Sequence, residues 1–401
     1  MSVKTLRVLT TLTLVAALSG AGAAGASVSF VAAGGNAQNS PPAVGRAARE
    51  SGLEASPCAG ALARGVVCEA ANRRALEAMG KGRLEAFTVV QDVRTGALVA
   101  FAASEPARLD VTSPVLPLSV SKLLLSASWW DNRQPDASFV STRGSARSRN
   151  PAFRSRVSVH EMLVGGSDSA GRQMAVALRK SVGAEAVLRD FERYGFGRSA
   201  GAARDEGFWA ELAPAWRSRL TPPPAYASLD AALKDGEWGD ALSIGESRMM
   251  VTGLHVSRFL QAVGNGGVML APAAREAREV SDEDANASRR RPGRPTRVMQ
   301  QSTALRLQAA MRDAVRRGTA RSIAAALADT GWQMGGKTGS GPGPMPLGPQ
   351  SDGWFAGLIF DPRGRARFTV ATFVRRGGLG GGNAARVSAE LARYLIGGER
   401  R

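Results

Sequence analysis

The chain has 401 residues, 44% of them hydrophobic and 21% charged, which is the composition of a globular protein with a sizeable core. Its length fits one large catalytic domain or two to three smaller ones. The formal net charge is +18 at pH 7, but the basic residues are scattered along the chain and form no nucleic-acid motif, so we predict no nucleic-acid partner.

The first 33 residues have the pattern of an export signal. Lys4 and Arg7 precede an apolar run over 8–18, and the small residues that follow fit an A-x-A cleavage site. The alternative is an uncleaved signal anchor over roughly 8–33, because no charged residue occurs from 8 to 44. Both readings place the protein outside the cytoplasm, and the anchor would add the membrane as a partner.

Residues 34–63 are predicted to form a linker or peripheral segment, since they are rich in Ala, Gly, Asn, Ser and Pro, and 64–401 to form the main domain. In an exported protein, Cys58 and Cys68, ten residues apart, suggest a disulfide. There are no other cysteines, and His160 and His255 lie far apart in the sequence. We therefore predict neither a metal site nor a cofactor.

Strand patterns occur near both ends of the main domain. After a short helix over 64–79, a hairpin is predicted over 86–103, with its turn at 94–96. The C-terminal part has a strand period with Gly/Pro turns, which predicts strands over 332–338, 353–360 and 367–375.

Between these strands the apolar residues recur every three or four positions, as in helices. The predicted helices cover 123–130, 159–164, 170–181, 184–194, 251–263, 303–327 and, at the end, 384–395. The polar stretch 131–156 is expected to be irregular. The resulting fold class is α/β in the broad sense (α+β), with a mostly antiparallel sheet that is assembled from both ends of the domain and packed with helices.

The motif Ser119-x-x-Lys122 opens one of these helices, directly after Pro117. Ser119 should lie in the first turn and Lys122 one turn later on the same face. A serine hydroxyl attacks a carbonyl only when a base removes its proton, and a neighbouring lysine can supply that base. Partial positive charge at the helix N-terminus would also favour an acyl oxyanion there.

Two later clusters carry related chemistry. Residues 165–170 lie at a helix junction, and 335–340 lie on a predicted strand whose glycines would let a ligand approach the backbone. In chain order the three motifs are Ser119-x-x-Lys122, Ser167-Asp168-Ser169 and Lys337-Thr338-Gly339. This set resembles the three motifs of the penicillin-binding protein and serine β-lactamase superfamily.

The resemblance extends over roughly residues 84–398 and most closely matches the transpeptidase domains of penicillin-binding proteins. Further similar segments are 93–98, 194–197, 243–245, 265–268 and 354–357. The resemblance implies the β-lactamase/transpeptidase-like fold, which adds an all-helical subdomain to the sheet. It also implies peptidoglycan stem peptides and β-lactam antibiotics as ligands, with other cell-wall synthesis proteins as candidate partners.

Carried onto matching positions, the resemblance implies that Ser119 forms an acyl-enzyme, that neutral Lys122 is the base and that Ser167 relays the proton to the leaving amine. A neutral Lys122 needs a pKa roughly 3 units below the reference near 10.4, which burial and a second cation would favour. The backbone N–H groups of Ser119 and Ser340 would form the oxyanion hole. The residues implied to bind substrate are Ser169, Lys337, Thr338, Gly339 and Ser340.

The second motif departs from the family pattern, which usually has Asn where this chain has Ser169. That amide normally bonds the substrate backbone or the lysine, so a shorter hydroxyl predicts looser substrate orientation and lower activity. An alternative register aligns Asp168 with the Asn.

Three other functions fit parts of the sequence. A Ser-His-Asp hydrolase lacks a Gly-x-Ser-x-Gly elbow, and His160, the only histidine upstream of Ser167, lies on a short helix where a structural role is expected. One class of β-lactamase activates water through the motif Glu-x-x-Leu-Asn, and this chain has only an imperfect match to that motif, at 185–189. A non-catalytic penicillin-binding sensor or scaffold remains open because of Ser169.

Overall fold

The computed structural model describes residues 53, 55–80, 82–142, 154–196, 243–245, 249–270, 295–341 and 350–397. All of them belong to one compact unit that starts at Pro42. The export signal predicted over 1–33, and most of the predicted linker, lie outside the described residues, so these domain boundaries stay predictions. Among the described helices, none is both long and apolar enough to span a bilayer.

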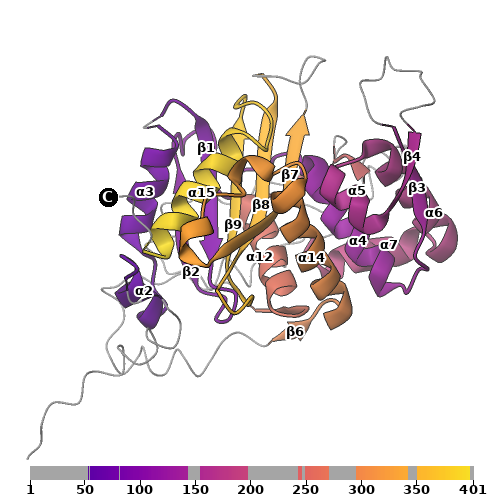
Figure 1. The fold of residues 1–401 in the computed structure, drawn as a ribbon, viewed down its shortest axis with the longest axis horizontal. Coiled ribbons are helices and arrows are strands. Elements are labelled where there is room, and N and C mark those ends of the chain that lie inside the picture. The colour runs from indigo at the N-terminus through magenta and orange to yellow at the C-terminus, as the bar shows by residue number, and fades with distance from the viewer. Residues whose placement is uncertain are drawn as a thin grey trace, which may run out of the picture. The chain divides into compact units, whose positions relative to one another are not determined.

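A five-stranded antiparallel sheet with strand order β2-β1-β9-β8-β7 organises the fold (Figure 1). Its strands are β1 (Glu85–Gln91), β2 (Leu98–Ala103), β7 (Gln333–Gly341), β8 (Asp352–Phe360) and β9 (Ala366–Arg375). The N-terminal hairpin β1–β2 pairs with C-terminal β9, with Phe87 opposite Phe373. The predicted sheet from both ends of the domain is therefore confirmed, and β7 lies at one edge of it.

Helices cover both faces of this sheet. Successive side chains of a strand point to opposite faces, and each face packs into its own apolar cluster. On β1, Phe87 and Val89 belong to the cluster that includes α12 (Gly253–Gly264) and α14 (Gln301–Arg317). Ala86 and Val90 belong to the cluster on the opposite face, formed with α3 (Glu69–Ala78) and α15 (Asn383–Leu395). Figure 1 shows α3 and α15 on the same side of the sheet.

A second group of helices packs beyond α14 (Figure 1) and carries two of the three motifs. It consists of α4 (Ser121–Asp131), α5 (Val159–Gly165), α6 (Asp168–Val182) and α7 (Ala184–Arg193). The stretch 131–156, predicted to be irregular, instead contains β3 (Ser138–Thr142), which pairs with β4 (Arg154–Ser158). Gln173 of α6 holds β3 by bonding the N–H and C=O of Val140, a polar attachment that hydrophobic periodicity cannot reveal.

The helix predicted over 303–327 is too long, because α14 ends at Arg317. There the chain turns onto α5, where Thr319 N donates to Val164 O at 3.2 Å. The apolar spacing beyond this point belongs to two short 3-10 turns, η5 (Arg321–Ile323) and η6 (Ala328–Thr330). The remaining elements are η1 (Leu118–Val120), α2 (Ala59–Arg64) and the small pair β5 (Val268–Met269) and β6 (Thr296–Arg297).

The predicted disulfide is formed, with an S–S distance of 2.08 Å between Cys58 and Cys68. Both cysteines belong to the cluster beneath α15, so the bond ties the segment around α2 and α3 to that face of the sheet.

Candidate active site

The serine turn places a hydroxyl against an amine. Leu118 and Ser119 lie in η1, which leads directly into α4, and Lys122 lies in the first turn of that helix. Lys122 is fully buried, with 0% side-chain exposure. Its Nζ donates to Ser119 Oγ at 2.7 Å, so the predicted meeting of these two groups is confirmed.

The second motif reaches the same amine through a carboxylate. Lys122 Nζ also donates to Asp168 Oδ1, the two atoms being 2.6 Å apart. The Asp168 side chain is 56% exposed, so it connects the buried amine of Lys122 to solvent. Asp168, and not Ser169, therefore contacts Lys122. This favours the alternative register of the motif, in which Asp168 takes the place of the family's Asn.

The two serines of the second motif are engaged at the start of α6. Ser167 is the N-cap of the helix, and its Oγ accepts from Ala170 N at 3.3 Å and lies 3.3 Å from Ser169 Oγ. Ser169 Oγ accepts from Thr142 N at 3.0 Å and donates to Val140 O at 3.1 Å. Ser169 therefore bonds to β3, whereas the family's amide would face the lysine.

The third motif lies on edge strand β7, directly against the serine turn. A side chain at Gly339 would begin 3.1 Å from Leu118 Cβ, so the glycine allows this close packing. Lys337 is only 2% exposed, and its Nζ donates to Thr338 O at 2.8 Å. A side chain at Gly166 would begin 3.6 Å from that same Nζ. All three motifs therefore converge on one site, as the sequence predicted.

Burial lowers the pKa of Lys337 from 10.5 to about 7. Water solvates an ammonium ion far better than a protein interior does, and the nearby Lys122 adds repulsion. Asp168 acts in the opposite direction but does not offset these two effects. Lys337 therefore gives up its proton far more readily than an exposed lysine does.

Two side chains of the third motif are held by neighbours that the sequence did not indicate. Thr338 Oγ1 donates to Thr319 Oγ1 at 2.7 Å, and Ser340 Oγ accepts from Gly380 N at 3.0 Å. Thr319 follows α14 and Gly380 follows β9, so neither adjoins a motif in the chain. Only Asp168 could have been found from the sequence, through the second register.

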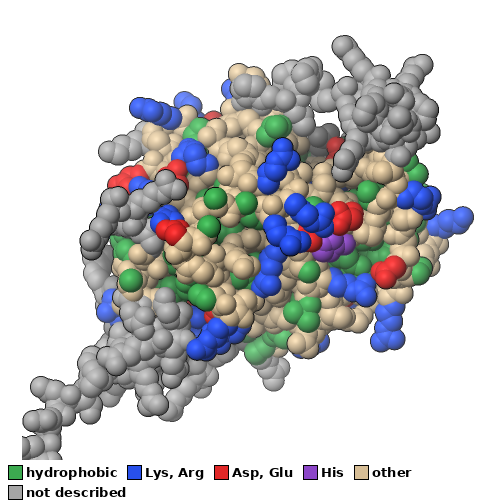
Figure 2. Space-filling model, in the orientation of Figure 1, with side chains coloured by type: hydrophobic (Ala, Val, Ile, Leu, Met, Phe, Trp, Pro, Cys, Tyr) green, Lys and Arg blue, Asp and Glu red, His purple; other side chains and the backbone are tan. Residues whose placement is uncertain are grey.

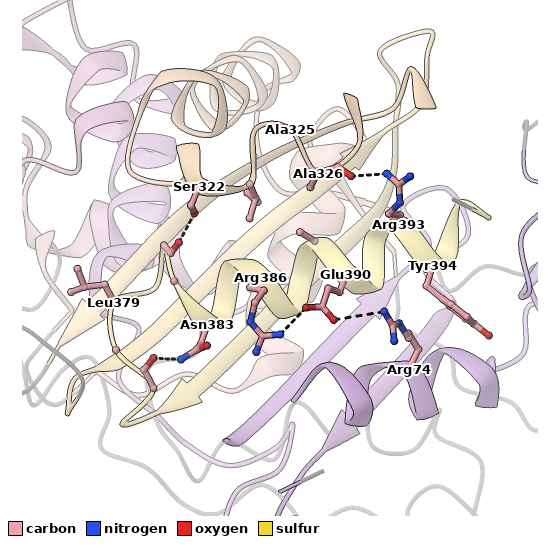
Figure 3. A pocket seen from close by; sticks show the side chains of 16 residues that line it. Arg74, Ser322, Ala325, Ala326, Leu379, Asn383, Arg386, Glu390, Arg393 and Tyr394 are labelled. Atoms are coloured by element: carbon pink, nitrogen blue, oxygen red, sulfur yellow. Dashed lines mark hydrogen bonds and ion pairs between the residues drawn. The ribbon is translucent and has the colours of Figure 1, made fainter. Parts of the chain in front are cut away.

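A large groove lies elsewhere, over the outer surface of α15 (Figure 3). Its volume is about 1330 Å³, and none of the motif residues lines it. Its arginines are paired with acids: Arg386 with Glu390 at 2.7 Å, and Arg393 with Asp329. Because no activated nucleophile lines this groove, we assign the chemistry to the cluster around Ser119.

Charged side chains outside the three motifs form no competing site among the described residues. Among the described residues, no three His, Cys, Asp or Glu side chains gather as a metal site would require. His160 Nε2 lies 3.0 Å from Asp313 Oδ2 and so links α5 to α14. Figure 2 shows Lys and Arg side chains in several separate places on the face drawn. The chemistry that the site supports is acyl transfer by Ser119, because its hydroxyl lies 2.7 Å from the Lys122 amine.

Comparison with known proteins agrees with this geometry. The family model described as the penicillin binding protein transpeptidase domain matches residues 86–396. The chain belongs to this family. The match to the transpeptidase domain nearly coincides with the span over which the sequence resemblance was recognised, and it confirms that recognition.

Solved structures show the same fold as this transpeptidase domain at low sequence identity. The D,D-transpeptidase domain of a peptidoglycan glycosyltransferase from Eggerthella lenta is 20% identical, with a TM-score of 0.58 and 80% of each chain covered. The ceftriaxone acyl-enzyme complex of penicillin-binding protein A from M. tuberculosis is 17% identical, with a TM-score of 0.59 and coverage of 80% and 77%. The apo transpeptidase domain of penicillin-binding protein 3 from Burkholderia pseudomallei is 17% identical, with a TM-score of 0.59 and coverage of 83% and 94%. No curated protein matched the chain.

Proposed function

We propose that this transpeptidase domain is an acyl-serine D,D-transpeptidase or carboxypeptidase that acts on D-Ala-D-Ala stem peptides of peptidoglycan and is acylated by β-lactams. The observation that carries the proposal is the convergence of Ser119, Lys122 and Lys337 at one site. Membership of the family supports an acyl-serine enzyme of peptidoglycan in general. One structural neighbour, penicillin-binding protein A from M. tuberculosis, is an acyl-enzyme complex with ceftriaxone.

In the proposed first step, Ser119 Oγ attacks the carbonyl of the penultimate D-Ala while a neutral Lys122 accepts the hydroxyl proton. The backbone N–H groups of Ser119 and Ser340 stabilise the oxyanion. Collapse of this intermediate breaks the peptide bond, and the leaving amine takes a proton from the Lys122 ammonium ion. Ser167, predicted from the sequence to relay this proton, is the N-cap of α6 and takes the middle position of the motif in the register that Asp168 favours. An acceptor amine or water then attacks the acyl-enzyme and releases Ser119.

The terminal carboxylate of the stem peptide is proposed to bind along β7. Lys337 in its protonated form supplies the charge, and Thr338 and Ser340 supply hydroxyl groups. Gly339 lets the serine turn and the bound carboxylate lie close to the same strand. Ser169, which the sequence predicted to bind substrate, would contact the substrate from its position beside β3.

A serine β-lactamase is less well supported, because Glu185, the first residue of its imperfect signature, is exposed in the first turn of α7. A penicillin-binding sensor stays a candidate because Asp168 replaces an amide at the lysine. Export is proposed from the N-terminal sequence, and the Cys58–Cys68 disulfide is consistent with an oxidising compartment. Binding to other cell-wall synthesis proteins stays a prediction.

Ser119→Ala is expected to abolish the covalent adduct that the protein forms with a penicillin, because the variant lacks the attacking oxygen. Intact mass spectrometry after incubation with the drug measures the adduct directly. The matched control is Ser121→Ala, since the buried Ser121 hydroxyl has no hydrogen-bond partner among the described residues and its loss should leave the adduct intact.

An adduct that persists in Ser119→Ala would contradict the assignment of the nucleophile. Rapid turnover of the drug by the unmodified protein would favour the β-lactamase. Acylation without any action on D-Ala-D-Ala peptides would favour the sensor.

Ser167→Ala is expected to slow acylation by about 100-fold if the hydroxyl relays a proton. It should also cost about 1 kcal/mol of stability, because the α6 N-cap is lost. Ser158→Ala is the matched control, since Ser158 caps α5 in the same way and Glu161 N donates to its Oγ. Equal acylation rates in the two variants, measured with a fluorescent penicillin, would leave Ser167 as a helix cap only.

A further inference from the structure

The active-site lysine has a carboxylate partner where the family pattern supplies a neutral amide. Lys122 Nζ lies 2.6 Å from Asp168 Oδ1 and 2.7 Å from Ser119 Oγ. An amide at this place could bond the amine in either protonation state. A carboxylate strongly prefers the ammonium form, because a charge-assisted pair at this distance is far stronger than a bond to a neutral amine.

Several other charged groups on the elements around α4 pair with one another. Asp190 of α7 pairs with Arg193 at 2.6 Å. On α5, His160 pairs with Asp313 of α14, and Glu161 pairs with Arg317, which also contacts Asp313.

The carboxylate of Asp168 on α6 and the amine of Lys337 on β7 both act on Lys122 from facing elements. Lys337 opposes a charge on Lys122, whereas Asp168 favours it. The carboxylate is in direct contact with Lys122 Nζ, with the two atoms 2.6 Å apart. Asp168 therefore dominates.

We propose that Asp168 is a positioning residue that holds Lys122 as an ammonium ion in the free enzyme, so that acylation of Ser119 proceeds only from the minor neutral form. This inference rests on the proposed function, because it concerns the base of that reaction. The neutral amine accepts the Ser119 proton as Oγ bonds to the carbonyl carbon and an electron pair moves to the carbonyl oxygen. An ammonium ion has no lone pair with which to do this.

The test is the pH profile of acylation by a fluorescent penicillin, measured over about pH 5 to 10. In Asp168→Asn the midpoint of the basic rise should move towards acid by about 1–3 pH units, and the rate at neutral pH should rise at least about tenfold. Asp168→Glu, which keeps the charge, should retain the alkaline midpoint. Asp136→Asn is the control for net charge, because Asp136 is 91% exposed and its only described ion pair is with Arg306 at 3.6 Å.

The outcomes separate this inference from the function on which it rests. If both proteins acylate with the same midpoint, or if Asp168→Asn is slower at every pH, Asp168 does not hold the charge of Lys122 and the inference is wrong, while the proposed function stands. If neither protein acylates at any pH, the proposed function itself fails. An alkaline midpoint in the unmodified protein that moves towards acid only in Asp168→Asn supports both.

Discussion

Lys337→Met is expected to give a protein that is more stable than the unmodified one at pH 6.5 and is no longer acylated by a penicillin. The amine is almost completely buried next to Lys122, and its pKa is lowered to about 7. Burying an ammonium ion carries a desolvation penalty of roughly several kcal/mol, and an apolar side chain of similar volume does not carry this penalty. Acylation should fail because the carboxylate of the drug loses its cationic partner.

The gain in stability should depend on pH. The unfolded chain holds the Lys337 proton up to about pH 10.4, whereas the folded protein releases it near pH 7. The unfolded state therefore binds more protons between these values, and the unmodified protein becomes less stable as the pH falls from about 10 to 7. The penalty is complete below pH 7, so the advantage of Lys337→Met should be larger at pH 6.5 than at pH 9.5.

Chemical denaturation at these two pH values measures the effect. Lys180→Met is the control, because Lys180 is exposed in the last turn of α6 and its removal should change stability little at either pH. A Lys337→Met protein that is less stable than the unmodified one at pH 6.5 would show that the folded site stabilises the ammonium form, contrary to the lowered pKa.

Gly245→Ala is expected to distort the serine turn, because Gly245 contacts the backbone of that turn. Gly245 has φ +64, and a Cβ there would lie 2.4 Å from Leu118 O and 2.6 Å from Leu118 N. Leu118 N also donates to Gly245 O at 3.2 Å, so the two backbones are in direct contact. Leu118 itself has φ +51, which is uncommon for a non-glycine residue and which this contact helps to maintain.

The added methyl group must displace the backbone that carries Ser119. A displacement of about 1 Å at a reacting group can cost about 100-fold in rate, and the overpacking should cost about 1–3 kcal/mol of stability. Gly60→Ala is the control, because a Cβ at Gly60 meets no atom within 4 Å. Acylation of Gly245→Ala at the unmodified rate would show that the turn tolerates the shift.

Much of the site could be predicted from the sequence because its chemistry lies in short motifs. Spacing alone placed Lys122 one turn after Ser119, and the change from helical to strand period placed Lys337 on a strand. The rotation of α6 could not be predicted, because Ser167, Asp168 and Ser169 are all polar and all suit a helix start. Packing of Ser169 against β3 decides that Asp168 faces the lysine.

The fold, too, could be predicted from the sequence only in part. Strands with apolar residues on one or both faces were found near their observed ends, but the β3–β4 hairpin was missed because few of its side chains are apolar. The end of α14 was missed because Ile323 and Leu327 continue the apolar spacing while the backbone has already turned. The pairing of Thr338 with Thr319 depends on that turn and had no local signal.

The pairing of β1 with β9 has a consequence for how the protein folds. Thr88 and Thr372, whose hydroxyl groups are 2.8 Å apart, are separated by 284 positions in the chain. In the unfolded polypeptide the first hairpin must therefore find a partner strand almost a whole chain length away, and pairing over such a distance is slow. Until β9 pairs with it, the free edge of β1 is open to association with other unfolded chains, so we expect aggregation during refolding to begin at this edge.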